Sequence, residues 1–165
     1  MSRRTLLSFL ALIVVTCIVA DRATKMIAEE TLRGKPQIEL AGGFFTLLYV
    51  ENAGAMLSFG ASLPSPARFL ILTVGVGILL AAMTVYLFRA KNPGMAQVIA
   101  VALMLGGGAS NLFDRLLRDG KVVDFMNLGI GPIRTGVFNV ADLAITAGVA
   151  VFLVSAMKKP PPVQG

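Results

Sequence analysis

Apolar residues gather along the chain in four long runs that are separated by more polar segments. The runs predict helices over approximately residues 6–27, 69–88, 95–115 and 137–157. Each run approaches the roughly 20 residues that a helix needs to cross a bilayer. We therefore predict one integral membrane domain, residues 1–165, of the all-α class with four transmembrane helices.

Two longer segments, residues 28–68 and 116–136, lie between the predicted helices on the same side of the membrane. The first contains "IELAGGFFTLLYVEN", which is rich in aromatic and β-branched residues and broken by Gly42 and Gly43. This composition predicts short strands, and it is too apolar for a solvated linker. We expect a small β-containing cradle on the membrane surface. The C-terminal "KKPPPVQG" is predicted to be disordered.

Composition agrees with a membrane protein, because 56% of the 165 residues are hydrophobic against about 45–50% in soluble domains. The N-terminus "MSRR" followed by an apolar run also fits a cleavable signal peptide. However, "VADRATK" offers no small-x-small cleavage site, which favours a retained helix.

The residue inventory excludes several kinds of chemistry. The chain has one cysteine and no histidine, so an intramolecular disulfide, Ser-His or Cys-His catalysis and a histidine metal site are excluded. We predict no metal and no cofactor. The net charge of +6 does not predict nucleic-acid binding, because the basic residues are not grouped with aromatic residues on a soluble face.

Charge placement predicts the orientation of the helices. Short segments at one end carry Arg3, Arg4, Arg89, Lys91, Lys158 and Lys159 and no acidic residue, whereas all nine acids fall toward the other end. By the positive-inside rule both termini are cytoplasmic. Residues 28–68 and 116–136 are then extracytoplasmic.

Polar residues inside the predicted helices cluster at that outer end. They are Asp21, Lys25, Asn111, Asp114, Arg115, Asn139 and Asp142. Ionisable groups within a membrane usually face a bundle interior or a wet cavity. The clustering therefore predicts a site near the outer interface.

Several of these signals have structural alternatives. Asp21 and Lys25 are four residues apart and share a helix face. They could form a structural ion pair or support the site.

Asn111, Asp114, Arg115 and Arg118 form one polar stripe. Arg118 fits interfacial snorkelling, whereas Asn111 is too deep for it. "GGG" at residues 106–108 lacks a phosphate loop's Lys-Ser/Thr and favours close helix packing. Asn52 and Gly54 alone predict only a turn.

Asp142 is the sole charged residue in its apolar run, and Asp124 lies in the short segment before it. We expect that segment to fold back so that the two carboxyl groups meet in a semi-buried site, share a proton and activate water. This is the arrangement of an aspartic peptidase. Membrane carboxylates also serve proton- or ion-coupled transporters, and a non-enzymatic scaffold would explain the helices alone.

Five motifs occur in register: "DRATK", "NAGA", "GGGASNLFDR", "VVDF" and "FNVAD". In this order and spacing they resemble the lipoprotein signal peptidase family (signal peptidase II) over nearly the whole chain. The sequence departs from the family pattern at Met56-Leu57, where a small residue and Phe are expected.

This resemblance implies an aspartic endopeptidase of the bacterial inner membrane. It would remove the signal peptide of a diacylglyceryl-modified prolipoprotein by cutting before the lipidated cysteine, and globomycin-type inhibitors would occupy the same cleft. Asp124 and Asp142 would be the catalytic pair. Asn52, Gly54, Asn111, Arg115 and Asn139 would bind substrate, with Asp21, Lys25 and Asp114 in support. The partners would be the precursor and membrane lipid, and we expect a monomer.

Overall fold

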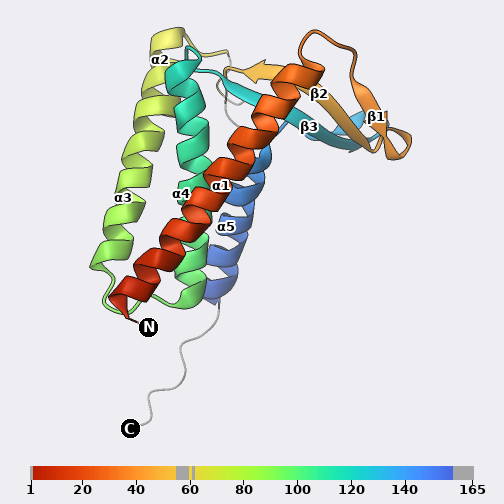
Figure 1. Ribbon diagram of the computed structural model, residues 1–165. Coiled ribbons are helices and arrows are strands. Elements are labelled where there is room, and N and C mark those ends of the chain that lie inside the picture. The colour runs from red at the N-terminus through yellow and green to blue at the C-terminus, as the bar shows by residue number, and fades with distance from the viewer. Residues whose placement is uncertain (1, 55–59, 61, 158–165) are drawn as a thin grey trace.

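The computed structural model describes residues 2–54, 60 and 62–157. Its elements are α1 (Arg3–Leu32), β1 (Ile38–Leu40), η1 (Ala41–Gly43), β2 (Phe45–Asn52), α2 (Ser65–Phe69), η3 (Leu70–Gly75), α3 (Val76–Arg89), α4 (Met95–Leu117), β3 (Val122–Ile130), β4 (Ile133–Arg134) and α5 (Val140–Met157). The predicted fold class is confirmed, because four helical spans carry a small sheet at one end (Figure 1). The predicted tail at residues 158–165 and the Met56-Leu57 departure lie outside the described residues.

The four spans are α1, the continuous α2–η3–α3 unit, α4 and α5, each long and apolar enough to cross a membrane. η3 is a π-helical segment within the second span. α1 begins and α5 ends at the end of the bundle opposite the sheet (Figure 1). α1 continues five residues beyond the predicted end at residue 27. Its last turns bury Ala28 and Leu32 against Phe125 of β3.

α4 is the central helix of the bundle, and three consecutive glycines let the other spans approach it. A Cβ on Gly106 would lie 2.6 Å from Cys17 of α1, and one on Gly108 would lie 2.6 Å from Leu80 of α3. A Cβ on Gly107 would collide with the carbonyl of Ala141 in α5. The prediction of close packing at these glycines is confirmed, with one glycine facing each neighbouring span.

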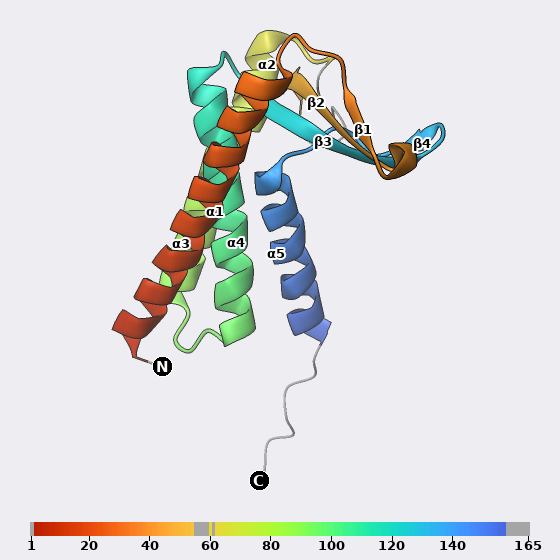
Figure 2. The ribbon, with the colours of Figure 1, turned by 45° about the vertical axis from the view of Figure 1, so that its right-hand side comes forward.

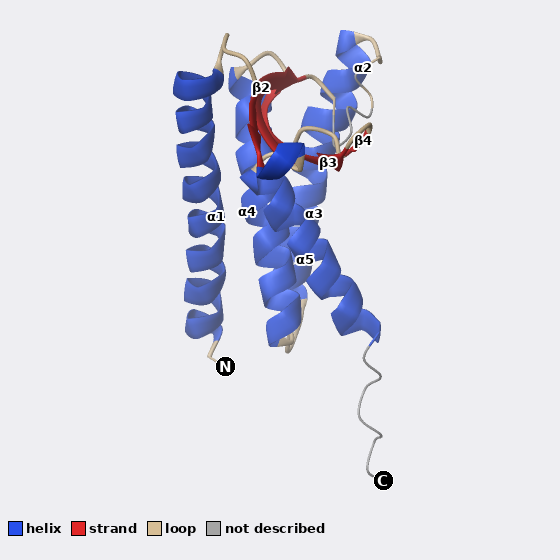
Figure 3. Cartoon of the chain, turned by 90° about the vertical axis from the view of Figure 1, so that its right-hand side faces the viewer, coloured by secondary structure: helices blue, strands red, loops and turns tan. Residues whose placement is uncertain are grey.

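The sheet is antiparallel in the order β1-β2-β3-β4. It extends sideways from the end of the bundle, and its strands curve above the start of α5 (Figures 2 and 3). Strands in residues 38–52 were predicted. The strand β3 was not, because "VVDFMNLGI" was interpreted as a connecting loop. Its apolar and β-branched residues pair with β2 through a register shift between Leu47 and Val50, which bends the strand next to the polar cluster.

Candidate active site

Asp142 is held at the start of α5 by a reciprocal cap with Asn139. The Asp142 backbone N–H donates to Oδ1 of Asn139 at 2.9 Å, and the Asn139 backbone N–H donates to Oδ2 of Asp142 at 3.1 Å. This exchange is a capping box, which satisfies donors of the first helical turn. The free carboxyl oxygen of Asp142 faces α4 and accepts from Nδ2 of Asn111 at 2.9 Å.

Asp124 is placed by the pairing of β3 with β2. It lies opposite Val50, and Asn52 at the end of β2 donates from Nδ2 to its Oδ2 at 2.8 Å. Asn139 donates from Nδ2 to its Oδ1 at 2.6 Å. Asp124 is only 2% exposed. The strand pairing therefore brings a carboxyl from the sheet to the head of α5, as the sequence predicted.

Asn139 joins the two carboxyl groups. Its side chain donates to Asp124, while its side-chain oxygen and backbone N–H exchange bonds with Asp142. Asn139 thus forms an amide bridge between the two carboxyl groups, and their sharing of one proton stays a prediction. Asn139 is fully buried, which fixes the separation of the two acids.

The pKa of the Asp124 carboxyl is raised to about 7, mainly by burial in the sheet. The negative charge of Asp142 contributes to this rise, while the amide donors of Asn52 and Asn139 act in the opposite direction. Desolvation is the dominant cause, because it penalises the charged form of a carboxyl. Asp124 therefore exchanges its proton near neutral pH.

A second buried cluster, centred on Lys25, lies directly behind this pair. The Lys25 ammonium contacts Oδ2 of Asp21 and Oδ2 of Asp114, each at 2.7 Å, and donates to Oδ1 of Asn111 at 2.8 Å. Its three protons therefore meet three acceptors. Asp21 also accepts from the backbone N–H of Ala141 at 2.8 Å. The cluster thereby ties α1, α4 and the first turn of α5 together around Asn111.

Sequence reasoning missed two members of this cluster. Arg22 pairs with Oδ1 of Asp114, and the Ser110 hydroxyl donates to Asp21 at 2.7 Å. Arg22 could have been found, because it stands within the "DRATK" motif next to Asp21. Ser110 gave no signal, because a serine in a membrane helix usually bonds its own backbone.

The polar stripe of α4 divides among several partners instead of facing one site. Arg115 donates from Nη2 to the carbonyl of Gly54 at 3.0 Å, and the Gly54 N–H donates to Asn52. Arg118 binds both carboxylate oxygens of Glu29, at 2.7 and 3.2 Å. The snorkelling interpretation of Arg118 stays a prediction, and the extended α1 adds Glu29 as a partner that the sequence did not indicate.

The structure thus brings together all the residues predicted for the site. Asn52, Asn111 and Asn139 contact the two acids. Gly54 is linked to them through Asn52, and Arg115 is linked through Gly54. Asp124 and Asp142 meet neutral donors, in contrast to Asp21 and Asp114, which pair with cations. Among the described residues, no group of three or more Cys, His, Asp or Glu side chains is arranged to hold a metal ion.

Comparisons with known proteins converge on one family. The family model "Signal peptidase (SPase) II" matches residues 13–158. The chain is 39% identical to a lipoprotein signal peptidase of Sphingopyxis alaskensis over 94% of this chain and 89% of that one. It is 39% identical to one of a Sulfurihydrogenibium species over 82% and 83%. A solved bacterial membrane enzyme aligns with a TM-score of 0.79 and 25% identity over 95% of both chains.

Proposed function

This chain belongs to the signal peptidase II family of aspartic peptidases, which remove signal peptides from prolipoproteins, and we propose that Asp124 and Asp142 are its catalytic pair. One observation carries the proposal: two carboxyl groups from different elements meet at Asn139, and both accept hydrogen bonds from neutral amides. Such acids keep a proton available for transfer, whereas cation-paired acids do not. The family assignment replaces the transporter and scaffold alternatives.

The two acids have different surroundings, which suggests different roles. Asp142 is partly exposed in the first turn of α5, where water can reach its carboxyl group, and it accepts the backbone N–H of Asn139. Asp124 is buried in the sheet, and its raised pKa favours its protonated form. We assign Asp142 as the general base and Asp124 as the general acid.

Hydrolysis then proceeds with a balanced transfer of protons. Asp142 takes a proton from water as the water oxygen attacks the scissile carbonyl carbon, and Asp124 gives its proton to the carbonyl oxygen. The tetrahedral intermediate collapses when protonated Asp142 donates to the leaving nitrogen and Asp124 recovers a proton from a hydroxyl. The C–N bond breaks, and both carboxyl groups return to their starting states.

The neighbouring residues position the acids and the precursor. Asn52, Asn111 and Asn139 hold the carboxyl groups, while Gly54 and Arg115 are suited to the precursor backbone. Asp21, Lys25 and Asp114 support Asn111 from behind. These are the binding and supporting roles that the family resemblance implies.

The precursor in this proposal is a diacylglyceryl-modified prolipoprotein that is cut before its lipidated cysteine. A lipid-bearing substrate keeps its scissile bond near the membrane interface, and the acids lie at the ends of the spans next to the sheet. We place this end outside a bacterial inner membrane and both termini in the cytoplasm, because Arg3, Arg89 and Lys91 lie at the opposite end. Globomycin-type inhibitors would occupy the same cleft of a monomer.

The decisive experiment measures cleavage of a lipidated precursor by the wild type, Asp124→Asn, Asp142→Asn and the double variant. Each single variant should lose activity by orders of magnitude, and the double variant should be little worse, because a concerted unit fails when one member is lost. Melting temperatures on the same samples establish that each variant is folded. Glu39→Gln, an exposed acid on the sheet, is the control and should cleave normally. A single Asn variant that cleaves at the wild-type rate would remove that aspartate from the mechanism.

A further inference from the structure

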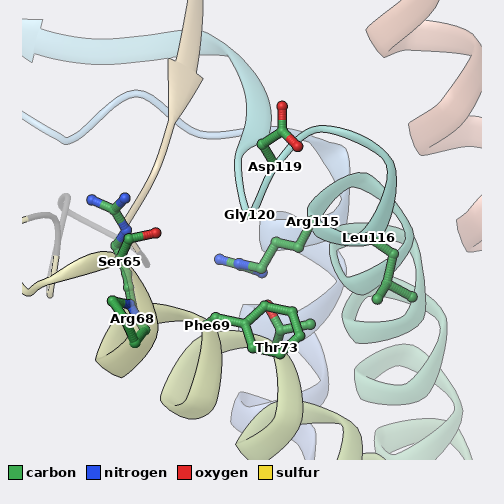
Figure 4. A pocket seen from close by; sticks show the side chains of 9 residues that line it. Ser65, Arg68, Phe69, Thr73, Arg115, Leu116, Asp119 and Gly120 are labelled. Carbon is green, nitrogen blue, oxygen red and sulfur yellow. The ribbon is translucent and has the colours of Figure 1, made fainter.

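A cavity of about 460 Å³ lies between the start of the second span and the end of α4. Arg68, Phe69 and Thr73 line it from the second span, and Arg115 and Asp119 line it from the α4 side. Figure 4 shows the Arg115 side chain extending into this space above Phe69 and Thr73. Nothing in the proposed mechanism uses Thr73.

Two polar atoms at this cavity are buried without a partner. They are the hydroxyl oxygen of Thr73 and Nε of Arg115, and they are the complete set of such side-chain atoms in the described part of the chain. Thr73 is 5% exposed and Arg115 is 8% exposed. Buried donors without acceptors are rare in native structures because each one costs stability. Because both atoms belong to residues that line one cavity, they point to a place where an acceptor from outside the chain could bind.

The backbone around Thr73 explains why its hydroxyl is available. Thr24, Thr31 and Thr84 each donate to the carbonyl four residues earlier in their helix, at 2.6–2.8 Å. Thr73 lies in the π-helical segment Leu70–Gly75, whose wider turn changes the relation between a hydroxyl and that carbonyl. π-segments within helices occur frequently at functional sites.

Hydrogen bonds connect the cavity to the proposed catalytic pair. Arg115 donates to the carbonyl of Gly54, the N–H of Gly54 donates to Asn52, and Asn52 donates to Asp124. Three hydrogen bonds therefore connect Arg115, and any acceptor bound to it, with Asp124. Arg68 and Arg115 place two positive charges at the same cavity and Asp119 places one negative charge there, so an anionic lipid headgroup is the competing acceptor that the test has to separate from the precursor.

We propose that the Thr73 hydroxyl and Arg115 Nε–H bind a backbone carbonyl of the precursor, close to the bond that is cut. A carbonyl oxygen has two lone pairs and can accept from both groups. The inference rests on the proposed function and adds Thr73 to it as a substrate-binding residue. It also implies that the unbound protein keeps an unsatisfied hydroxyl that the precursor satisfies.

The test compares Thr73→Val, Thr73→Ser and Thr84→Val in cleavage of a lipidated precursor in a neutral detergent without anionic lipid. Thr73→Val should raise KM about three- to tenfold, the value of one net hydrogen bond, with kcat within about twofold. Its melting temperature should equal or exceed that of the wild type, because the variant removes an unsatisfied buried group. Thr73→Ser should retain the wild-type KM. Thr84→Val should too, because Thr84 bonds its own helix away from the cavity.

Three results would overturn the inference. Thr73→Val with a wild-type KM would show that the hydroxyl does not meet the precursor. Thr73→Ser with the same raised KM as Thr73→Val would show that the packing of this position, and not its hydroxyl, sets KM. A KM effect that appears only after phosphatidylglycerol is added would assign the cavity to a lipid headgroup. A wild-type chain that cleaves no lipidated precursor would refute the proposed function itself, so the two failures are distinguishable.

Discussion

Replacing Lys25 with methionine tests whether the buried cluster behind the active site is held by its central cation. Methionine has a similar length but leaves Asp21 and Asp114 without the ammonium that contacts both at 2.7 Å. Asp114 keeps Arg22, whereas the donors that Asp21 keeps within the described part of the chain are the neutral Ser110 hydroxyl and Ala141 N–H. The cost of the substitution therefore falls mainly on Asp21.

Removing one partner of a buried ion pair costs about 3–5 kcal/mol, because the other charge stays buried and uncompensated. We expect Lys25→Met to lose about that much unfolding free energy, measured by SDS titration in mixed micelles. The double variant Lys25→Met/Asp21→Asn should recover about 2 kcal/mol of it, because the orphaned charge is gone. The control Lys35→Met, at an exposed position, should change stability by less than about 0.5 kcal/mol.

Activity of the same variants reports on the contact between Lys25 and Asn111. The double variant restores charge balance but not the hydrogen bond to Asn111, whose side-chain oxygen keeps the Asn139 donor alone among the described residues. It should therefore be more stable than Lys25→Met and still cleave more slowly than the wild type. If Lys25→Met were as stable as the wild type, or if the effects of the two substitutions simply added, the charge-compensation argument would be refuted.

Three further predictions concern proton binding, packing and orientation. The raised pKa of Asp124 means that the folded state holds this proton more tightly than the unfolded state. The stability that Asp124 contributes is therefore present below about pH 4 and lost as pH rises through about 7. The melting temperature of the wild type should fall over that interval relative to Asp124→Asn. Gly107→Ala should destabilise the bundle by about 1–3 kcal/mol, whereas Gly77→Ala, whose Cβ would have an ordinary 3.8 Å contact, should not; equal melting temperatures would contradict the packing argument. Cysteines at Lys35 and Asp119 in a Cys17→Ser background should react with an impermeant thiol reagent in intact cells, and reaction only after lysis would reverse the orientation.

Much of the site could be predicted from the sequence because membrane burial makes polar residues conspicuous. Asp142 and Asn111 stand out in apolar helices, and a chain of limited length between α4 and α5 must bring Asp124 near Asp142. Gly106–Gly108 could likewise be interpreted correctly, since glycine in a membrane helix usually marks close packing. These inferences need only one helix or one short connection.

The parts that could not be predicted depend on contacts between distant segments. The strand around Asp124 becomes regular only by pairing with β2, so its own sequence resembled a loop. The pairing of Arg118 with Glu29 depends on the five residues by which α1 extends beyond its predicted end, because Glu29 lies among them. The Thr73 hydroxyl lacks its usual intrahelical partner because of a π-helical turn, for which apolar periodicity gives no signal. The cap between Asn139 and Asp142 was visible as Asn-x-x-Asp but was not recognised.

The pairing of Asp21 with Lys25 also bears on how the chain enters the membrane. Synthesis delivers α1 before α4 and α5, so Asp21 initially lacks Ser110 and the Ala141 N–H, and Lys25 lacks Asn111 and Asp114. During this interval, the partner four residues away is the nearest opposite charge. A carboxylate and an ammonium that neutralise each other lower the free-energy cost of placing the newly synthesised helix in lipid. The residues that later brace the active site thus first serve as each other's counter-ion during insertion.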